Sequence, residues 1–331
     1  MAGATTYGDG STLNREDLLD MITVVEPTQG VITSLAGKAA KPGALFTEWG
    51  LDAYNTPAFP GEEEGEDVTT FDNPAKKRAR IGNYQQKFRR TWLVTEEQEE
   101  TNTAGIKDEV ANAKARAFIE LKRDIESAIA SDQEMQTTNP TKLRGLGTWI
   151  QATSQAVNPV PTAYLSPAGH INTTTTASLA DSDLNGVLQS VYEQSGNDMA
   201  RYTLVIGPAG RSAITNLQRA VGGGAGNPYT VNQDAKEHKI NLKVSEYQGD
   251  YGRIFVVPTL FNGRTDGGSL TNQAKARGYL IDPGMIDLRY MSLPKQKQLE
   301  DQGAGPRGFI SAILTLCVKS PLALGKFAAT S

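Results

Sequence analysis

The chain has 331 residues, with 33 Lys or Arg against 37 Asp or Glu, and a formal net charge of −4. Hydrophobic residues make up 38% and charged residues 21%, which indicates an ordered protein of two or three domains whose core needs no covalent cross-links. The basic side chains are matched by acidic ones, which argues against tight DNA binding through a basic surface.

Three further features bear on localisation. Cys317 is the single cysteine, so no intramolecular disulfide can form, and a lone thiol fits a reducing compartment. No run of about 18 apolar residues occurs, so no transmembrane helix is expected. The first residues lack the pattern of a secretory signal. We therefore expect the protein to remain in the cytoplasm and to make no contact with a membrane.

Residues 1–43 predict an N-terminal arm. Asn14 is a suitable N-cap for a short helix that reaches Ile22. Pro27 argues against continuation of that helix, and a second short amphipathic piece from Gly30 to Leu35 can follow. These pieces contain too few apolar residues to form a core, so we expect an arm that lies on another surface or a disordered tail.

Residues 44–94 predict a long β-hairpin. Alternating patterns at 45–49 and 84–92 predict two strands. The stretch between them is acidic at Glu62, Glu63, Glu64, Glu66 and Asp67, and then basic at Lys76, Lys77, Arg78 and Arg80. Limbs of about 24 residues could project up to about 80 Å at about 3.3 Å per residue, and realistically about half of that. Because a two-stranded ribbon alone is marginally stable, we expect it to need a neighbouring surface.

Residues 95–132 predict a long helix. Thr95 and Gln98 form a capping-box pattern, and a break is expected near Gly105. One face then carries an apolar stripe at Ile106, Val110, Ala113, Ala117, Leu121, Ile125 and Ala128. The opposite face, which we expect to be solvated or to face an interface, carries Lys107, Asp108, Lys114, Arg116, Lys122, Arg123 and Glu126. A helix over 106–132 would be about 40 Å long, a spine for its domain.

The second half of the chain predicts an α/β unit and a set of strands. Residues 152–180 are rich in Thr, Ser and Pro, and we expect them to form a surface excursion. A helix through residues 184–191 should end near Gly196. After it we predict a strand at 202–206, a helix at 209–220, and strands at 240–247, 253–258, 278–281, 286–290 and 309–320.

No constellation of side chains predicts catalysis, cofactor binding or a metal site. His170 and His238 are expected to be solvated, and no serine lies in a nucleophile-elbow pattern. Cys317 lies in an apolar strand, where a small buried side chain is the favoured interpretation. One cysteine and two distant histidines cannot supply a zinc site. The glycines at 222–226 lack the lysine of a phosphate loop, and the acids at 62–67 lack the spacing of a calcium loop.

The projecting elements predict self-association. A compact globule of 331 residues has a radius of gyration near roughly 20 Å, so a ribbon of about 40 Å or more must extend beyond it. Surface of that kind is covered most simply by copies of the same chain. An enzyme of this size normally has a convergent set of nucleophile, base and orienting residues, and none is evident.

The ordered landmarks resemble those of a known family, the major capsid proteins of tailed double-stranded DNA phages. The resemblance covers nearly the whole chain except 152–180, 261–273 and the glycine cluster. It rests on the order and spacing of motifs at residues 14–18 (NREDL), 26–28 (EPT), 47–49 (TEW) with Asp52, 82–84 (GNY), 120–126 (ELKRDIE), 191–196 (VYEQSG), 207–208 (GP), 234–237 (DAKE), 256–258 (VVP) and 281–283 (IDP).

The resemblance implies an α+β fold of the type shared by tailed-phage and herpesvirus shells. Its parts would be an N-terminal arm (1–43), an extended β-hairpin loop (44–94), a peripheral domain with a long spine helix (95–180), an axial α/β domain (181–275) and return strands of the peripheral domain (276–331). Hexamers and pentamers would tile the icosahedral shell of a virion, assembled in the host cytoplasm, that encloses DNA without sequence-specific binding. No enzymatic activity or cofactor is implied, and decoration, scaffolding and portal proteins would be further partners.

We expect the ribbon to lie over a neighbouring subunit. In this hypothesis the acids from Glu62 to Asp67 and the cations from Arg78 to Arg90, with Arg89 among them, meet opposite charges there. Exposed ion pairs contribute only about 0 to 1 kcal/mol each, so they would set the register. Apolar side chains such as Trp49 and Trp92 would supply most of the adhesion.

Three alternatives remain open from the sequence. The shell protein of a non-viral nanocompartment would enclose an enzyme cargo instead of DNA. A phage decoration or tail structural protein would not close into shells as an isolated chain. An enzyme, such as a hydrolase with an unrecognised pair of carboxylates, would show turnover without assembly.

Overall fold

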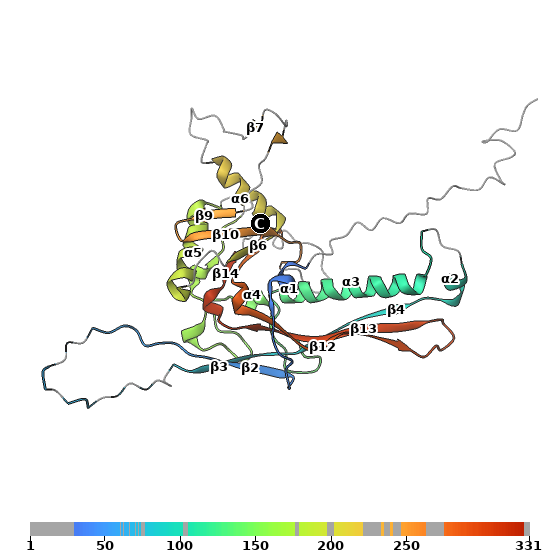
Figure 1. Cartoon of the computed structure of the whole chain (residues 1–331), viewed down its shortest axis with the longest axis horizontal. Coiled ribbons are helices and arrows are strands. Elements are labelled where there is room, and N and C mark those ends of the chain that lie inside the picture. The colour runs from blue at the N-terminus through green and yellow to red at the C-terminus, as the bar shows by residue number, and fades with distance from the viewer. Residues whose placement is uncertain are drawn as a thin grey trace, which may run out of the picture.

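The computed structural model describes residues 30–59, 61, 63–65, 67–69, 71, 73, 77–101, 105–175, 179–196, 202–220, 233–234, 239–240, 246–262 and 275–327. The predicted helix at 14–22, the glycine cluster at 222–226 and His238 lie outside these residues, as do Glu62, Glu66 and Lys76. Two sheets form the body of the described part, and a long helix lies along one of them (Figure 1). This mixed α+β architecture agrees with the predicted fold class.

The first sheet, which we name the long sheet, has the strand order β1-β12-β13-β4. Strand β12 (Ile286–Leu299) runs antiparallel to β13 (Arg307–Val318), and β13 runs antiparallel to β4 (Gln86–Leu93). The short β1 (Gly37–Lys38) adds to β12 in parallel. Every second residue of β13 from Gly308 onward is buried, because one face of the sheet packs against a helix.

That helix is α3 (Glu109–Ile129), the predicted spine, which begins and ends three residues inside the expected range. Its N-cap is Asp108, whose side chain accepts a hydrogen bond from Ala111 N at 2.8 Å. The predicted apolar stripe is confirmed, since Ala117, Leu121 and Ile125 are buried. The preceding α2 (Glu96–Glu100) is capped by Thr95, as predicted, with Gln98 N donating to Thr95 Oγ1 at 3.3 Å.

The predicted hairpin is shorter than expected. Strand β2 (Phe46–Leu51) pairs with β3 (Ala79–Tyr84), and the residues after Gln85 leave this ribbon to join the long sheet as β4. Gln85 is buried, and its Nε2 donates to Thr47 Oγ1 at 3.0 Å. The single strand predicted at 84–92 is therefore divided, because the two halves bury their apolar side chains in different places. Residues 52–78, between β2 and β3, are named the extended loop.

The second sheet has six strands in the order β5-β14-β11-β6-β10-β9. Its centre is β6 (Thr203–Ile206), which is buried along its whole length. The other strands are β5 (Ile171–Asn172), β9 (Glu246–Gly249), β10 (Gly252–Pro258), β11 (Gly278–Ile281) and β14 (Gly325–Phe327). Residues 276–327 thus supply strands to both sheets, which differs from the predicted assignment of this segment to one domain.

The remaining elements are helices, short strands and 3₁₀ turns. Helix α5 (Asp181–Ser195) ends at Gly196, whose φ of 61° suits glycine, as the sequence predicts. The others are α1 (Val31–Leu35), α4 (Leu146–Trp149), α6 (Pro208–Ala220), the short strands β7 (Gln233–Asp234) and β8 (Lys239–Ile240), and the 3₁₀ turns η2 (Thr162–Tyr164), η3 (Ala168–His170), η5 (Pro283–Met285) and η6 (Pro321–Ala323).

Glu126 is buried, although the sequence predicted that it lies on the solvated face of α3. Its carboxylate is fully buried and accepts hydrogen bonds from Ile32 N at 2.7 Å and Thr33 N at 2.9 Å. These amides belong to the first turn of α1, where backbone donors have no partner within the helix. Glu126 therefore holds the segment that contains α1 against the spine helix, a contact between residues more than 90 positions apart.

Replacing Glu126 is expected to loosen this contact. Glu126→Ala should lower the free energy of unfolding by about 2 to 3 kcal/mol, because two buried amides lose a charged acceptor. Glu126→Gln keeps one acceptor oxygen and should lose less. Urea unfolding of the dissociated subunit measures both changes, and equal stability of the alanine variant and the native chain would contradict the assignment.

The same residue predicts a pH dependence. Burial raises the pKa of Glu126 above its ordinary value of 4.5, although the backbone amides of Thr33 and Ile32 oppose the shift. The folded state then binds more protons than the unfolded state, so this contribution to stability is present below about pH 4.5 and is lost as pH rises through the folded pKa. Glu126→Gln should remove that part of the profile.

The segment 152–180 is also corrected. Instead of a surface excursion, it buries Val160, Tyr164 and His170, and Ile171–Asn172 within it form β5. His170 is fully buried, so its predicted place in solvent is wrong. Its Nδ1 lies 3.1 Å from Leu324 O and its Nε2 lies 3.0 Å from Ser190 O. The ring thereby connects α5 to the residues before β14.

His170 predicts a loss of stability in mild acid. Two carbonyl oxygens face the ring, while a neutral imidazole has one N–H donor. Burial lowers the pKa of His170 below 6.5, against the effect of the two carbonyls. The unfolded state then binds more protons, so the native chain should lose free energy of unfolding as pH falls below about 6.5.

The matched comparison is His170→Gln, which cannot titrate. Urea unfolding at several pH values should show a flatter profile for this variant between about pH 6.5 and 5. His170→Leu should cost about 1 to 3 kcal/mol at neutral pH, because the buried carbonyls lose their donor. Parallel profiles for the native chain and the glutamine variant would contradict the prediction.

Candidate assembly surfaces

The extended loop exposes large apolar side chains. Tyr54 is 99%, Phe59 96%, Val68 72% and Phe71 81% exposed to solvent. The loop projects from the body at the end of the β2–β3 ribbon (Figure 1). Isolated apolar side chains are common on protein surfaces, but four on one projecting loop mark a candidate interaction site. None of the four was among the predicted contact residues; the available indication in the sequence was that aromatic residues such as Phe59 lie near Pro57 and Pro60 within a polar stretch.

Polar contacts fasten the root of the extended loop. Arg78 Nε lies 3.1 Å from Asp52 Oδ2, and Lys77 Nζ donates to Tyr54 O at 2.7 Å. Tyr164 donates from its hydroxyl to Lys77 O, which ties the root to the body. A hollow of about 530 Å³ lies between the two limbs at this point. The loop is therefore held at its base while its tip projects.

The predicted charged residues divide into two groups. Glu63, Glu64 and Asp67 are exposed at the loop tip. Several predicted cations already have partners in their own subunit: Arg78 pairs with Asp52, Arg80 Nε lies 3.5 Å from Glu48 Oε1, and Arg90 Nη2 donates to Asp124 Oδ1 at 2.6 Å.

Arg89 and Arg90 point to opposite faces of β4. Arg90 faces α3, and the pairing with Asp124 raises its pKa. Arg89 is exposed, and none of the described residues forms an ion pair with it. The two neighbouring arginines, which the sequence treats alike, therefore have different environments because side chains alternate along a strand.

Trp49 and Trp92, the two tryptophans predicted to contact a neighbour, pack within their own subunit. Trp92 is buried between β4 and α3, with Lys114 Nζ 4.9 Å from its ring centroid. Trp49 is half-buried, donates from Nε1 to Val318 O at 2.9 Å, and lies 5.7 Å from the ring of Trp149. This differs from the expectation that these indoles supply adhesion to a neighbour, because their apolar surface already stabilises their own core.

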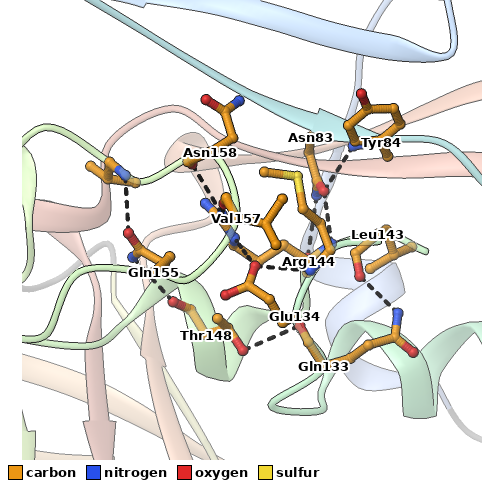
Figure 2. A network of polar contacts seen from close by, with 12 residues as sticks. Asn83, Tyr84, Gln133, Glu134, Leu143, Arg144, Thr148, Gln155, Val157 and Asn158 are labelled. Carbon is orange, nitrogen blue, oxygen red and sulfur yellow. Dashed lines mark hydrogen bonds and ion pairs between the residues drawn. The ribbon is translucent and has the colours of Figure 1, made fainter. Parts of the chain in front are cut away.

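A buried polar network lies where β3 passes into β4 (Figure 2). Arg144 is fully buried; its Nε lies 2.8 Å from Glu134 Oε1, and its Nη2 donates to Asn158 O at 3.1 Å and to Val157 O. Asn83 accepts from Arg144 N at 2.7 Å and donates to Leu316 O at 2.8 Å. Burial lowers the pKa of Arg144, although Glu134 opposes the shift. The network ties the ribbon that carries the extended loop to β13.

The remaining predictions concern Cys317, metal binding and membrane-spanning helices. Cys317 is buried in β13, as predicted, and burial raises the pKa of its thiol to about 11. The described residues contain no group of three or more His, Cys, Asp or Glu side chains placed to hold a metal ion. None of the helices in the described part of the chain combines the length and apolarity needed to span a bilayer.

Comparison with solved structures shows the same fold in phage capsids. The chain is similar to a chain of the mature capsid of bacteriophage PhiM1, with a TM-score of 0.65, 10% identity, and coverage of 100% of this chain and 97% of that one. For a chain of the capsid of cyanophage A-1(L), the TM-score is 0.64 and the identity is 13%, with 97% of this chain and 98% of that chain covered. For a chain of the capsid of a native GTA particle, the TM-score is 0.62 and the identity is 12%, with 100% of both chains covered.

Comparison with protein families gives a match along almost the whole sequence. The family model described as SU10 major capsid protein matches residues 4–331. No curated protein sequence matches the chain. The resemblance to the major capsid proteins of tailed phages is thus confirmed. The chain belongs to the SU10 major capsid protein family, and it is a structural protein of the phage capsid.

Proposed function

We propose that this protein assembles as hexamers and pentamers into an icosahedral shell that encloses double-stranded DNA, and that the extended loop is the principal adhesive element between subunits. Support comes from the match to a capsid family along residues 4–331. The observation that carries the role of the loop is the exposure of Tyr54, Phe59, Val68 and Phe71.

Burial of these side chains by a neighbour would favour assembly. A phenylalanine side chain contributes about 1.5 to 3 kcal/mol when it moves from water to a fully buried site. Exposed ion pairs of the acids at 63–67 would add only about 0 to 1 kcal/mol each and would mainly set the register. Of the predicted contact residues, the proposal therefore keeps the loop acids and Arg89, and replaces the two tryptophans by Phe59 and Phe71.

Other partners would act on this shell. Decoration, scaffolding and portal proteins are proposed as accessory partners, without assignment to particular residues. DNA is proposed as cargo without sequence-specific contacts, since the net charge of the chain is −4 and its basic residues are matched by acids.

The test is direct assembly of the expressed chain. Negative-stain microscopy and sedimentation velocity should show closed shells or capsomers, with a monomer present only at low concentration. A compact monomer that persists at millimolar concentration would overturn the proposal. Shells that copurify with an enzyme cargo and no nucleic acid would point instead to a nanocompartment.

A further inference from the structure

The spine helix α3 carries a row of exposed side chains on one side. We name it the exposed row; its members are Ala111, Ala115, Phe118, Ile119 and Lys122. They recur at spacings of three or four residues, so they lie on the same side of the helix. Phe118 is 36% and Ile119 is 40% exposed. Figure 1 shows the long sheet along one side of α3, and α1 beside the C-terminal end of α3 only.

Helix α1 lies at the end of this row. Glu126, four residues after Lys122, continues the exposed row and accepts the hydrogen bonds from the first turn of α1. A Cβ at Gly30, the first described residue, would lie 3.1 Å from Glu126 Oε2, so the backbone of Gly30 lies against this carboxylate. The chain that precedes Gly30 therefore starts where the uncovered part of the row begins.

The surface around the row is apolar and basic. Among the exposed residues of α3, the charged ones are Arg116 and Lys122. None of the carboxylates in the described part of the chain forms an ion pair with either of them. Lys122 Nζ lies 4.5 Å from the centroid of the Phe118 ring. Such a surface is complementary to an amphipathic helix that carries acidic side chains.

The sequence before Gly30 contains a segment of that kind. A helix over residues 14–22, which the sequence predicts, would place Leu18, Met21 and Ile22 on one face, with Asp17 at the edge of that face. Residues 1–29 carry five acidic side chains and one basic side chain: Asp9, Glu16, Asp17, Asp20 and Glu26 against Arg15. The segment is thus complementary to the exposed row in charge and in apolar character.

We propose that residues 14–22 form a helix that packs on the exposed row of their own chain. Residues 23–29 connect this helix to Gly30, and seven extended residues span up to about 23 Å. The row from Glu126 to Ala111 is about 22 Å long, so the whole row is within reach. A connection this short gives the segment a high effective concentration, which favours it over the same segment of another copy.

This contact gives the N-terminal segment a role in the single subunit. An uncovered apolar row on a projecting helix promotes non-specific association. Packing of residues 14–22 would cover Phe118 and Ile119 before the subunit meets any other chain. The inference does not depend on the proposed function, because failure of the chain to form shells would leave this contact unchanged.

Hydrogen exchange of the dissociated full-length subunit tests the contact. The amides of residues 14–22 should exchange about 10-fold more slowly in the native chain than in a variant with Phe118→Ser and Ile119→Ser, because the variant lacks the apolar surface for packing. A variant with Phe118→Leu and Ile119→Leu should keep the protection. The amides of Leu121 and Ile125 should stay protected in all three chains, which shows that α3 remains folded.

Disulfide formation distinguishes the chain's own segment from that of a second copy. A chain with Leu18→Cys and Ile119→Cys should form a disulfide within the monomer at low protein concentration, because the connected helix brings the two thiols together. The matched control is Leu18→Cys with Glu193→Cys, which places the second thiol at an exposed position of α5, beside the six-stranded sheet, and should form no such bond. The native thiol of Cys317 is buried and does not compete.

Four outcomes would overturn the inference. Exchange of residues 14–22 at the unprotected rate in the native subunit would show that the segment does not pack. Equal protection in the native chain and the serine variant would place the segment on another surface. Disulfides that form only between chains would make the segment of a second copy the occupant. Protection that appears only in assembled shells would likewise assign the contact to a neighbour.

Discussion

Replacing Phe59 and Phe71 together with serine is expected to abolish shell formation at concentrations where the native chain assembles. Both rings are largely exposed in the isolated subunit, so replacing them removes little packing within the subunit. If a neighbour buries them, each contributes about 1.5 to 3 kcal/mol to the contact. The double substitution should then weaken each contact by about 3 to 6 kcal/mol, which is roughly 10² to 10⁴-fold in its association constant.

The measurement is sedimentation velocity over a range of concentrations, with urea unfolding of the subunit in parallel. The free energy of unfolding should change by no more than about 0.5 kcal/mol, because surface substitutions away from packed features are nearly neutral. A variant with Phe59→Leu and Phe71→Leu keeps apolar side chains and should still assemble. Normal shells from the serine variant would remove the loop from its proposed role.

Arg144→Ala is expected to destabilise the subunit itself by about 3 to 5 kcal/mol. The substitution leaves Glu134 without its cation and two backbone carbonyls, those of Val157 and Asn158, without a donor. Arg144 is fully buried while Glu134 is partly exposed, so the cost combines the lost ion pair with the two carbonyls that lose their donor. It also removes the guanidinium from the face of Trp149, whose ring centroid lies 4.8 Å from the Arg144 Cζ.

Urea unfolding of the dissociated subunit should show this loss. The matched control is Arg144→Lys, which retains the charge beside Glu134 and should lose less, although it cannot make the same forked set of hydrogen bonds. Adding Glu134→Gln to Arg144→Ala should recover part of the loss, because the unpaired carboxylate is then absent. A loss below about 1 kcal/mol for Arg144→Ala would show that the network does not hold the ribbon in place.

Elements with strong local patterns were predictable from the sequence. Helix α3 combines a repeating apolar stripe with an acidic N-cap, α5 ends at a glycine, and β6 is a short apolar run between turns. Each pattern lies within one element, so periodicity and end preferences are sufficient to identify it. The family resemblance was likewise carried by the order of short motifs.

The candidate site was only partly predictable. The acidic tip of the extended loop is evident as a run of charges, whereas the choice of Trp49 and Trp92 as contact residues rested on their size alone. Size predicts burial, but it does not say whether the subunit or a neighbour provides the cover. Phe59 and Phe71 lie in a polar stretch of the sequence and were not predicted as contact residues, yet the fold leaves them exposed.

The sequence by itself determined the fold class, the spine helix, the projecting acidic loop and the capsid family. Only the tertiary structure decided that Glu126 and His170 are buried, that one predicted strand divides at Gln85, and that Arg89 and Arg90 face opposite ways. The physical reason is that burial depends on contacts between distant segments: Glu126 meets residues 94 positions away and His170 meets one 154 positions away. Local patterns contain no information about such contacts.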